Sequence, residues 1–260
     1  MAATKENPII FYDLVSAKGT SFSPNPYKTR LSLNYKGLPY RVEYVAFPDI
    51  EPRMKELGVT PVSETYPRYT LPVIADPSDD PNGKPIYISD SFKIALYLDD
   101  KYPAPKYPAI FAPHTRSLQH LIMTQYFPTI STCVGPIFLP NMPRLLDARS
   151  AEFLNRTRGE LLQPLPDDVA AQKWEEARKK FVAFSKSVQL NDGTENEGPF
   201  IMGKAVSFLD FALGGLYYWI KNIEGEDSAR LKEVLEWEGG RWGKHHQAIR
   251  EIENASSQVD

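Results

Sequence analysis

The first hundred residues alternate short apolar runs with stretches of helical periodicity. Residues 9–14 are apolar and β-forming, and a Ser-Pro pair at 23–24 opens a helical stretch that Gly37 and Pro39 bring to an end. Strands joined by crossover helices predict a mixed sheet covered by helices. The predicted order is strand, helix, strand, helix, strand, strand, helix, over residues 9–14, 24–35, 40–46, 52–57, 71–75, 85–88 and 91–98, with the DPSDDPNGK turn at 76–84 between the last two strands.

The pattern changes after residue 101. Four prolines fall between residues 102 and 113, which excludes a helix there and predicts a stiff linker. Helical periodicity dominates the rest of the chain, with one stretch so apolar on every side that it predicts a buried central helix. The predicted helices cover 114–134 with a kink at Pro128, 172–190, 208–220 (the central one) and 229–237. We therefore predict an α/β domain at 1–101, a linker at 102–113 and an all-α domain at 114–260.

Composition narrows the function classes. The chain has 30 Lys and Arg against 33 Asp and Glu, a formal net charge of −3, and no polybasic run, so we expect no nucleic-acid partner and no membrane partner. Its one cysteine, Cys133, excludes an intramolecular disulfide and fits a reducing compartment. The apolar run at 9–14 is too short for a signal-peptide core or a membrane span, so we expect a cytoplasmic protein.

Ser23 stands at the predicted N-cap of the first helix, and Pro24 occupies the first helical position. Both residue types are favoured there, so a capping role alone would explain Ser23. The same geometry suits an anion, because free N–H groups and the positive end of the helix dipole point out of this terminus. Both interpretations stay open at the level of this segment.

A serine hydroxyl at that terminus can donate a hydrogen bond to a bound thiolate. A hydrogen bond to a charged group contributes about 1.5–3 kcal/mol, and the helix dipole contributes about 0.3–2 kcal/mol. Since about 1.36 kcal/mol corresponds to one pKa unit, the two together can bring the pKa of a bound thiol from about 8.5 to near neutrality. Such a site would supply a thiolate nucleophile without a cysteine from the protein.

Two further segments carry candidate binding residues. Pro72 opens a strand and is either a plain edge-strand proline or a cis proline that turns the backbone of Leu71 outward to pair with an extended peptide. Asp90 and Ser91 begin the last helix of the first domain, where they are either another N-cap or a site for a ligand. In the second case Asp90 would take an ammonium group, and Ser91 with the helix terminus would take a carboxylate.

Taken in order, these features resemble the soluble glutathione transferase family. The shared features are a capped helix after the first strand, Leu-Pro-Val opening the third strand, Asp-Ser opening the next helix, a proline linker and an all-α half. The segment SPNPYKTRLSLNYKGLPY at 23–40 further resembles the fungal serine-type Fuα class, which is related to bacterial lignin β-etherases. The resemblance covers nearly the whole chain. It implies a thioredoxin-like domain for glutathione and a helical bundle that forms an apolar co-substrate site.

The resemblance assigns roles to single residues. Ser23 aligns with the residue that activates the glutathione thiol, and Asn25 lies near enough in the helix to reach the sulfur. Leu71 would pair with the cysteinyl backbone next to a cis Pro72, and Asp90 with Ser91 would hold the γ-glutamyl end. The anchor for the glycine carboxylate stays open, because Thr70 stands where members often have a longer polar residue; the alternatives are Arg68, Arg53 and Lys55.

A last resembling segment concerns folding rather than chemistry. GKAVSFLDF at 203–211 resembles the capping box and hydrophobic staple that open the central helix in this family. Ser207 would be the cap and Asp210 its partner, while Val206 would pack on Phe211.

We expect a serine-type transferase whose thiolate attacks an electrophilic carbon of a small apolar aromatic compound, such as a plant- or wood-derived one, in a homodimer without a metal. Attack on an aryl ether, ester or peroxide would give an etherase, esterase or peroxidase side activity. Detoxification is the corresponding role. A ligandin-like protein that binds glutathione and sequesters aromatics is the alternative, and an interaction scaffold without glutathione is a third possibility. The aromatic candidates for the pocket are Tyr126, Phe127, Phe138, Tyr217, Tyr218 and Trp219, of which two or three are expected to face a substrate.

Other candidates for chemistry are explained better by packing. Some family members activate the thiol with a tyrosine near the end of the first strand, but Tyr12 lies well inside that strand. Cys133 falls in the helical half, where a buried core residue is expected. His245 and His246 are adjacent, so on a helix they point about 100° apart and pair poorly for one metal.

Overall fold

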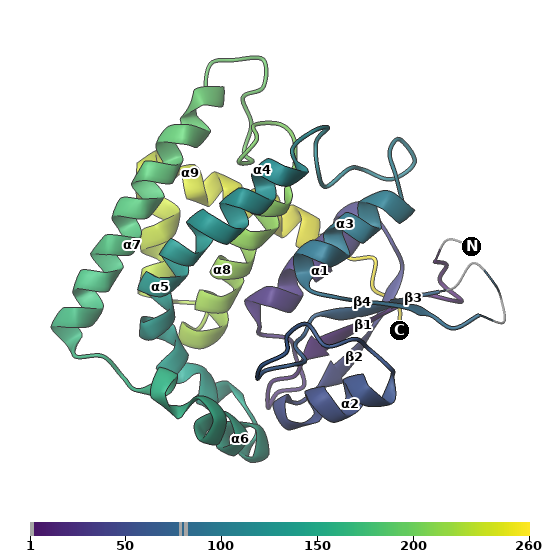
Figure 1. Cartoon of the computed structure of the whole chain (residues 1–260). Helices are drawn as coiled ribbons and strands as arrows, with labels where there is room; N and C mark the ends of the chain where they lie inside the picture. Colours follow the sequence, from purple (N-terminus) through teal and green to yellow (C-terminus); the bar gives the residue numbers. More distant parts are fainter. Residues whose placement is uncertain (1–2, 78–79, 81–82) are drawn as a thin grey trace.

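The computed structural model describes residues 3–77, 80 and 83–260, and its N-terminal half is built on a four-stranded mixed sheet (Figure 1). The spatial order is β2–β1–β3–β4. β1 is parallel to β2 and antiparallel to β3, and β4 is antiparallel to β3. The strands are β1 (Ile9–Leu14), β2 (Tyr40–Val45), β3 (Val73–Asp76) and β4 (Ile86–Ser89), as predicted to within two residues, while part of the predicted 76–84 turn lies outside the described residues.

Three helices cover the sheet. α1 (Pro24–Lys36) and α3 (Ser91–Lys101) lie on one face, and α2 (Ile50–Glu56) lies on the other (Figure 1). β1 and β4 point the same way because both are antiparallel to β3, so the helices that follow them both begin at the same edge of the sheet. The N-termini of α1 and α3 are thereby brought to one side of the domain. α1 ends as predicted at Gly37, which adopts a left-handed conformation with φ 63°.

The C-terminal half is helical and confirms the predicted fold class. Residues 102–115 form neither helix nor strand, and the domain limits themselves remain a prediction from composition. The predicted kink at Pro128 coincides with a π-helical turn over Ile122–Tyr126, directly before the proline-containing helix. The α-helices are α4 (Arg116–Leu121), α5 (Phe127–Phe138), α6 (Ala148–Arg158), α7 (Asp167–Val188), α8 (Phe208–Glu224) and α9 (Ala229–Asn254).

Two helical segments, α6 and the second part of α9, were not predicted from the sequence. α6 has only Ser150 and Leu154 buried, so it carries no apolar stripe to reveal it. The helix predicted over 229–237 does end there, but the helical path resumes and α9 continues to Asn254. The interruption at residues 237–240 includes Gly239 and Gly240, whose φ angles of 68° and 79° break the helical period.

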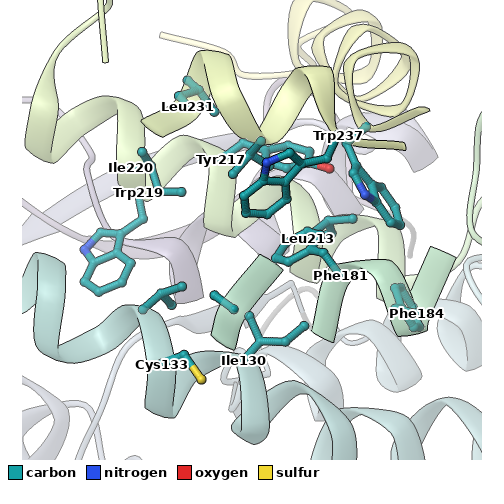
Figure 2. Packing of buried hydrophobic residues seen from close by; sticks show 14 of the residues in the cluster. Ile130, Cys133, Phe181, Phe184, Leu213, Tyr217, Trp219, Ile220, Leu231 and Trp237 are labelled. Atoms are coloured by element: carbon teal, nitrogen blue, oxygen red, sulfur yellow. The ribbon is translucent and has the colours of Figure 1, made fainter. Parts of the chain in front are cut away.

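α8 is the buried central helix that its sequence predicts. Figure 2 shows Leu213 and Tyr217 of this helix gathered with Trp237, and Ile130 and Cys133 of α5 lie opposite them. The helix begins with the predicted capping box: Ser207 and Asp210 satisfy each other's backbone reciprocally. Buried Asp210 also accepts from the Ile201 N–H at 2.7 Å and lies 3.0 Å from Nε2 of His245, so one carboxylate fixes three segments.

The end of the chain returns to the sheet. The Val259 N–H donates to the Tyr40 carbonyl at 2.8 Å, so the last residues pair along the outer edge of β2. Arg30 of α1 donates to the Gln258 side chain and to buried Asp13 of β1, each at 2.9 Å. The C-terminal tail thus covers an edge strand and binds the helical half to the sheet.

Close packing of α8 on α1 joins the two halves near the start of α1. A Cβ on Gly215 would lie 2.8 Å from the Pro24 carbonyl oxygen, so the two helices meet without a side chain between them. Two further contacts come from Tyr218: its ring stacks on Tyr27 with centroids 4.0 Å apart, and its hydroxyl donates to the Ser21 carbonyl at 2.8 Å. α8 therefore fixes the position of the segment that leads into α1.

We predict that Gly215→Ala lowers the free energy of unfolding by about 1–3 kcal/mol, because its methyl group must push the α1 backbone away. Urea unfolding monitored by circular dichroism measures this. Gly135→Ala is the matched control, since its Cβ would meet only Leu139 Cδ1 at 3.7 Å and alanine favours a helix over glycine by about 1 kcal/mol. Equal stability changes in the two variants would contradict the close contact.

Candidate functional site

A cleft of about 590 Å³ opens between the sheet domain and the helices. One wall comes from the start of α1 and the segment before β3, and the other comes from α5 and α8. The second wall is almost entirely apolar. Residues that line the cleft include Phe22, Ser23, Asn25 and Leu71 on the first side, and Phe127, Ile130, Val134, Leu216 and Trp219 on the second.

Ser23 lines this cleft at the N-terminus of α1. Its backbone is extended (φ −84°, ψ 136°), as expected for an N-cap, but its hydroxyl makes no capping hydrogen bond. Capping alone therefore does not explain the serine. Although the residue is only 7 % exposed, the surface that it keeps faces the cleft, and exposed Asn25 lies on the same rim.

The Leu71–Pro72 peptide bond is cis, as the family resemblance implied, whereas the segment alone had also left a plain edge-strand proline open. Leu71 is buried and lines the cleft, and its backbone N–H and C=O take no partner among the described residues. The Pro72 carbonyl accepts from the Asp90 N–H at 3.3 Å. This hydrogen bond places the start of α3 beside the segment that carries Leu71.

Asp90 caps α3, as the simpler interpretation predicted. Its Oδ1 accepts from the N–H groups of Phe92 and Lys93 at 2.9 and 3.0 Å. Its backbone has a φ of 78°, a conformation that costs a non-glycine residue about 1–3 kcal/mol and that clusters at functional sites. Ser91 follows as the first residue of α3 and is 6 % exposed. Neither residue lines the cleft itself.

Lys28 of α1 lies in the cleft wall and was missed from the sequence. It is half-buried, and its stem runs near the position of a Gly215 side chain. Burial lowers the pKa of its ammonium group to about 8, and the Asp90 carboxylate opposes this shift. The sequence could have indicated that Lys28 lies near the site, because it stands one helical turn after Pro24 and so lies on the same face of α1.

A second groove of about 460 Å³ shares lining residues with the cleft, and residues of α2 and Arg68 line it. Of the three cations considered for the glycine carboxylate, Arg53 is held by Glu43 and Glu56, and Lys55 pairs with Glu51 at 2.6 Å. Exposed Arg68 has no ion pair among the described residues. The structure thus leaves Arg68 the most available of the three.

The residues set aside in the sequence analysis are indeed packed. Tyr12 is 3 % exposed outside the cleft, and burial raises its pKa to about 12, which disfavours it as an activator. Cys133 is a buried core residue whose pKa is raised by burial.

Among the described residues no cluster of three His, Cys, Asp or Glu side chains is arranged for a metal, and no helix is long and apolar enough to cross a membrane.

Two of the six aromatic candidates, Phe127 and Trp219, line the cleft. Phe138 and Tyr217 are core residues, Tyr218 stacks on Tyr27, and Tyr126 stacks on Phe184 with ring centroids 5.2 Å apart. Of the six, these two therefore line the cleft, while the others serve packing.

Comparisons with known proteins agree with this architecture. The family models for "Glutathione S-transferase, N-terminal domain" and "Glutathione S-transferase, C-terminal domain" match residues 22–101 and 117–251. The glutathione S-transferase-like protein ustS of Aspergillus flavus is 31% identical over 256 residues, covering 93% of this chain and 90% of that protein.

Two solved fungal structures are similar over nearly their whole length. A glutathione S-transferase of Ceriporiopsis subvermispora in complex with glutathione is 35% identical with a TM-score of 0.82, covering 95% of this chain and 98% of that one. The glutathione transferase GSTFuA3 of Phanerochaete chrysosporium is 32% identical with a TM-score of 0.82, covering 94% and 97%. The second likeness agrees with the Fuα resemblance in the sequence.

We predict that the Lys28 amine titrates with a pKa of about 8, and that Asp90→Asn lowers this value because it removes the carboxylate that favours the charged form. NMR of ¹³C-methylated lysines against pH measures both. Asp100→Asn, at the far end of α3 and paired with Arg116, is the control and should leave the Lys28 value unchanged. A Lys28 pKa near 10.5, or a value insensitive to Asp90, would contradict the described geometry.

Proposed function

The chain belongs to the glutathione S-transferase family, and we propose that it activates the thiol of bound glutathione with Ser23. The observation that carries the proposal is the position of this hydroxyl. It lies in the interdomain cleft at the N-terminus of α1 and is not used to cap the helix. The hydroxyl and the dipole of a 13-residue helix act on the same point, so both would stabilise a thiolate there. Asn25, on the same rim, would donate a second hydrogen bond.

The groups around Ser23 fit the remainder of a glutathione molecule. The Leu71 backbone leaves one donor and one acceptor for the cysteinyl peptide unit, next to the cis Pro72. Asp90 uses Oδ1 for capping, which leaves Oδ2 for the γ-glutamyl ammonium group, and Ser91 with the α3 terminus would take the α-carboxylate. Arg68, in the adjoining groove, would take the glycine carboxylate.

We propose that the second substrate is a small apolar aromatic electrophile. The helical wall of the cleft offers Phe127, Trp219 and aliphatic side chains, and a volume of about 590 Å³ is in the range of ordinary small-molecule sites. The thiolate would attack an electrophilic carbon, or displace the leaving group of an aryl ether or ester. Holding both reactants in one cleft supplies proximity, and Ser23 supplies the nucleophile. Wood-derived aromatics and detoxification fit this chemistry.

We also propose a homodimer. Leu118 and Leu121 of α4 are 53 % and 55 % exposed and stand three positions apart, so they share one face of the helix. Large aliphatic side chains exposed side by side are favoured at protein–protein interfaces.

The thiolate absorbance of bound glutathione against pH tests the serine mechanism. In the wild type we expect a thiol pKa at least one unit below the value of free glutathione, and in Ser23→Ala a return toward that value, because the donor is lost. Ser131→Ala is the matched control: this serine also lines the cleft, but its hydroxyl donates to the Phe127 carbonyl at 3.2 Å. It should behave as the wild type does.

An unshifted thiol in both the wild type and Ser23→Ala would refute the serine mechanism and favour the ligandin-like alternative. Turnover against a panel of aromatic electrophiles then separates the two functions. A binding protein would take up the aromatics without forming a conjugate.

We predict that Leu121→Glu converts the dimer to a monomer, because a charge would be buried in the interface. Sedimentation equilibrium measures the mass. Leu190→Glu is the control, since Leu190 is 81 % exposed but lies in the 3-10 turn Gln189–Asn191 after α7 and not on α4. A wild type that is already monomeric would contradict the assignment of α4, as would a Leu121→Glu variant that stays dimeric.

A further inference from the structure

The charged residues of the interdomain cleft are all of one sign. Among the described residues that line it, Lys28 and Arg158 carry charge, and no Asp or Glu does so. Neither cation forms an ion pair with a described residue. Although the protein has slightly more acidic than basic residues, the lining of its largely apolar cleft therefore carries two cations and no carboxylate among the described residues.

Arg158 belongs to the helical half and occupies the boundary between the cleft and the adjoining groove, since it lines both. It is half-buried at the end of α6, and its guanidinium lies over the Phe47 ring at 5.9 Å from the centroid. α6 is fixed to the sheet domain by Arg149, which donates to both carboxylate oxygens of Asp49. The Phe47 ring thus orients the guanidinium, and none of its N–H donors binds a described residue, so they are available to a ligand.

The two cations differ in their surroundings. Lys28 interacts electrostatically with the Asp90 carboxylate, which compensates part of its charge and belongs to the proposed γ-glutamyl site. Arg158 instead has its guanidinium over the Phe47 ring, in a cleft whose lining also includes apolar Leu139 and Met142. The glycine carboxylate has Arg68 available in the groove. The proposed glutathione contacts thus leave Arg158 unused, and of the two cations in the cleft only Lys28 interacts with a residue of the proposed glutathione site.

We propose that Arg158 determines specificity by binding a carboxylate on the aromatic co-substrate, so that the acceptor is an aromatic acid rather than a neutral aromatic. The ring lies against the apolar wall of the cleft, and the carboxylate receives the paired N–H donors of the guanidinium. This inference rests on the proposed function, because it names the substrate class of the same cleft. A half-buried arginine next to an aromatic ring suits such a ligand, since one end of it is apolar and the other anionic.

Equilibrium binding of an unreactive matched pair, 2-naphthoate and 2-naphthamide, to the glutathione-loaded protein tests this by calorimetry. The wild type should bind the carboxylate about tenfold or more tightly, as one charged hydrogen-bond pair provides. Arg158→Gln should bring the two affinities within about twofold of each other, and Arg158→Lys should keep part of the preference. Arg156→Gln, two residues earlier and outside the cleft lining, should keep all of it.

Three outcomes would overturn the proposal: a wild type that does not prefer the carboxylate, a preference that survives Arg158→Gln but is lost in Lys28→Gln, or a loss of glutathione affinity in Arg158→Gln with the preference intact. The last would assign Arg158 to glutathione itself. Because neither ligand reacts, the result is independent of Ser23. Failure of the serine mechanism would appear in the thiol titration and leave the naphthoate preference unchanged.

Discussion

The site depends on how closely α8 approaches α1. Gly215 faces the Pro24 carbonyl with no side chain between the two helices. The Tyr218 hydroxyl of α8 also donates to the carbonyl of Ser21, in the segment just before α1. The helical half thus determines where the first turn of α1 lies, although the residues of that turn belong to the sheet domain. The contact thus helps to keep the start of α1 and buried Ser23 in the cleft wall, away from the water and salt that weaken a helix dipole and a hydrogen bond.

The topology of the chain explains why the sheet domain supplies the polar groups of the cleft and the helical half supplies its apolar wall. β1 and β4 run in the same direction, so α1 and α3 present their N-termini at one edge of the sheet. Two helix N-termini at one edge suit a ligand with several negative groups, which is the nature of a thiolate peptide such as glutathione. The helices of the second half contribute little polarity. They supply an apolar wall and, through α6, one guanidinium.

Local signals in the sequence account for much of this arrangement. Gly37 requires a left-handed backbone, so its place at the helix end could be predicted from residue type alone, whereas the Ser207–Asp210 capping box and the cis bond before Pro72 were predicted from the family resemblance. The role of Asp90 as the N-cap of α3 could also be predicted from its residue type and position. The sequence did not predict that the Ser23 hydroxyl makes no hydrogen bond to its own helix. Whether an N-cap serine makes that hydrogen bond depends on its surroundings in the folded protein.

What could not be predicted depends on contacts between distant segments. α6 lacks an apolar stripe, so neither the helix nor the place of Arg158 at its end was visible in the sequence. The choice among Arg68, Arg53 and Lys55 likewise needed the ion pairs that Glu43, Glu56 and Glu51 form in the fold. Gly215 carries no helical signal of its own, and its purpose appears only when the Pro24 carbonyl is seen beside it.

The central claim is that the hydroxyl at the start of α1 holds the sulfur of glutathione. A crystal structure of the glutathione complex tests it most directly through one distance, from Ser23 Oγ to that sulfur. We expect a separation of about 3.0–3.5 Å, as for a hydroxyl that donates to a thiolate, with the sulfur facing the cleft. A sulfur more than about 4.5 Å from Ser23 Oγ, and bound instead by another donor, would contradict it.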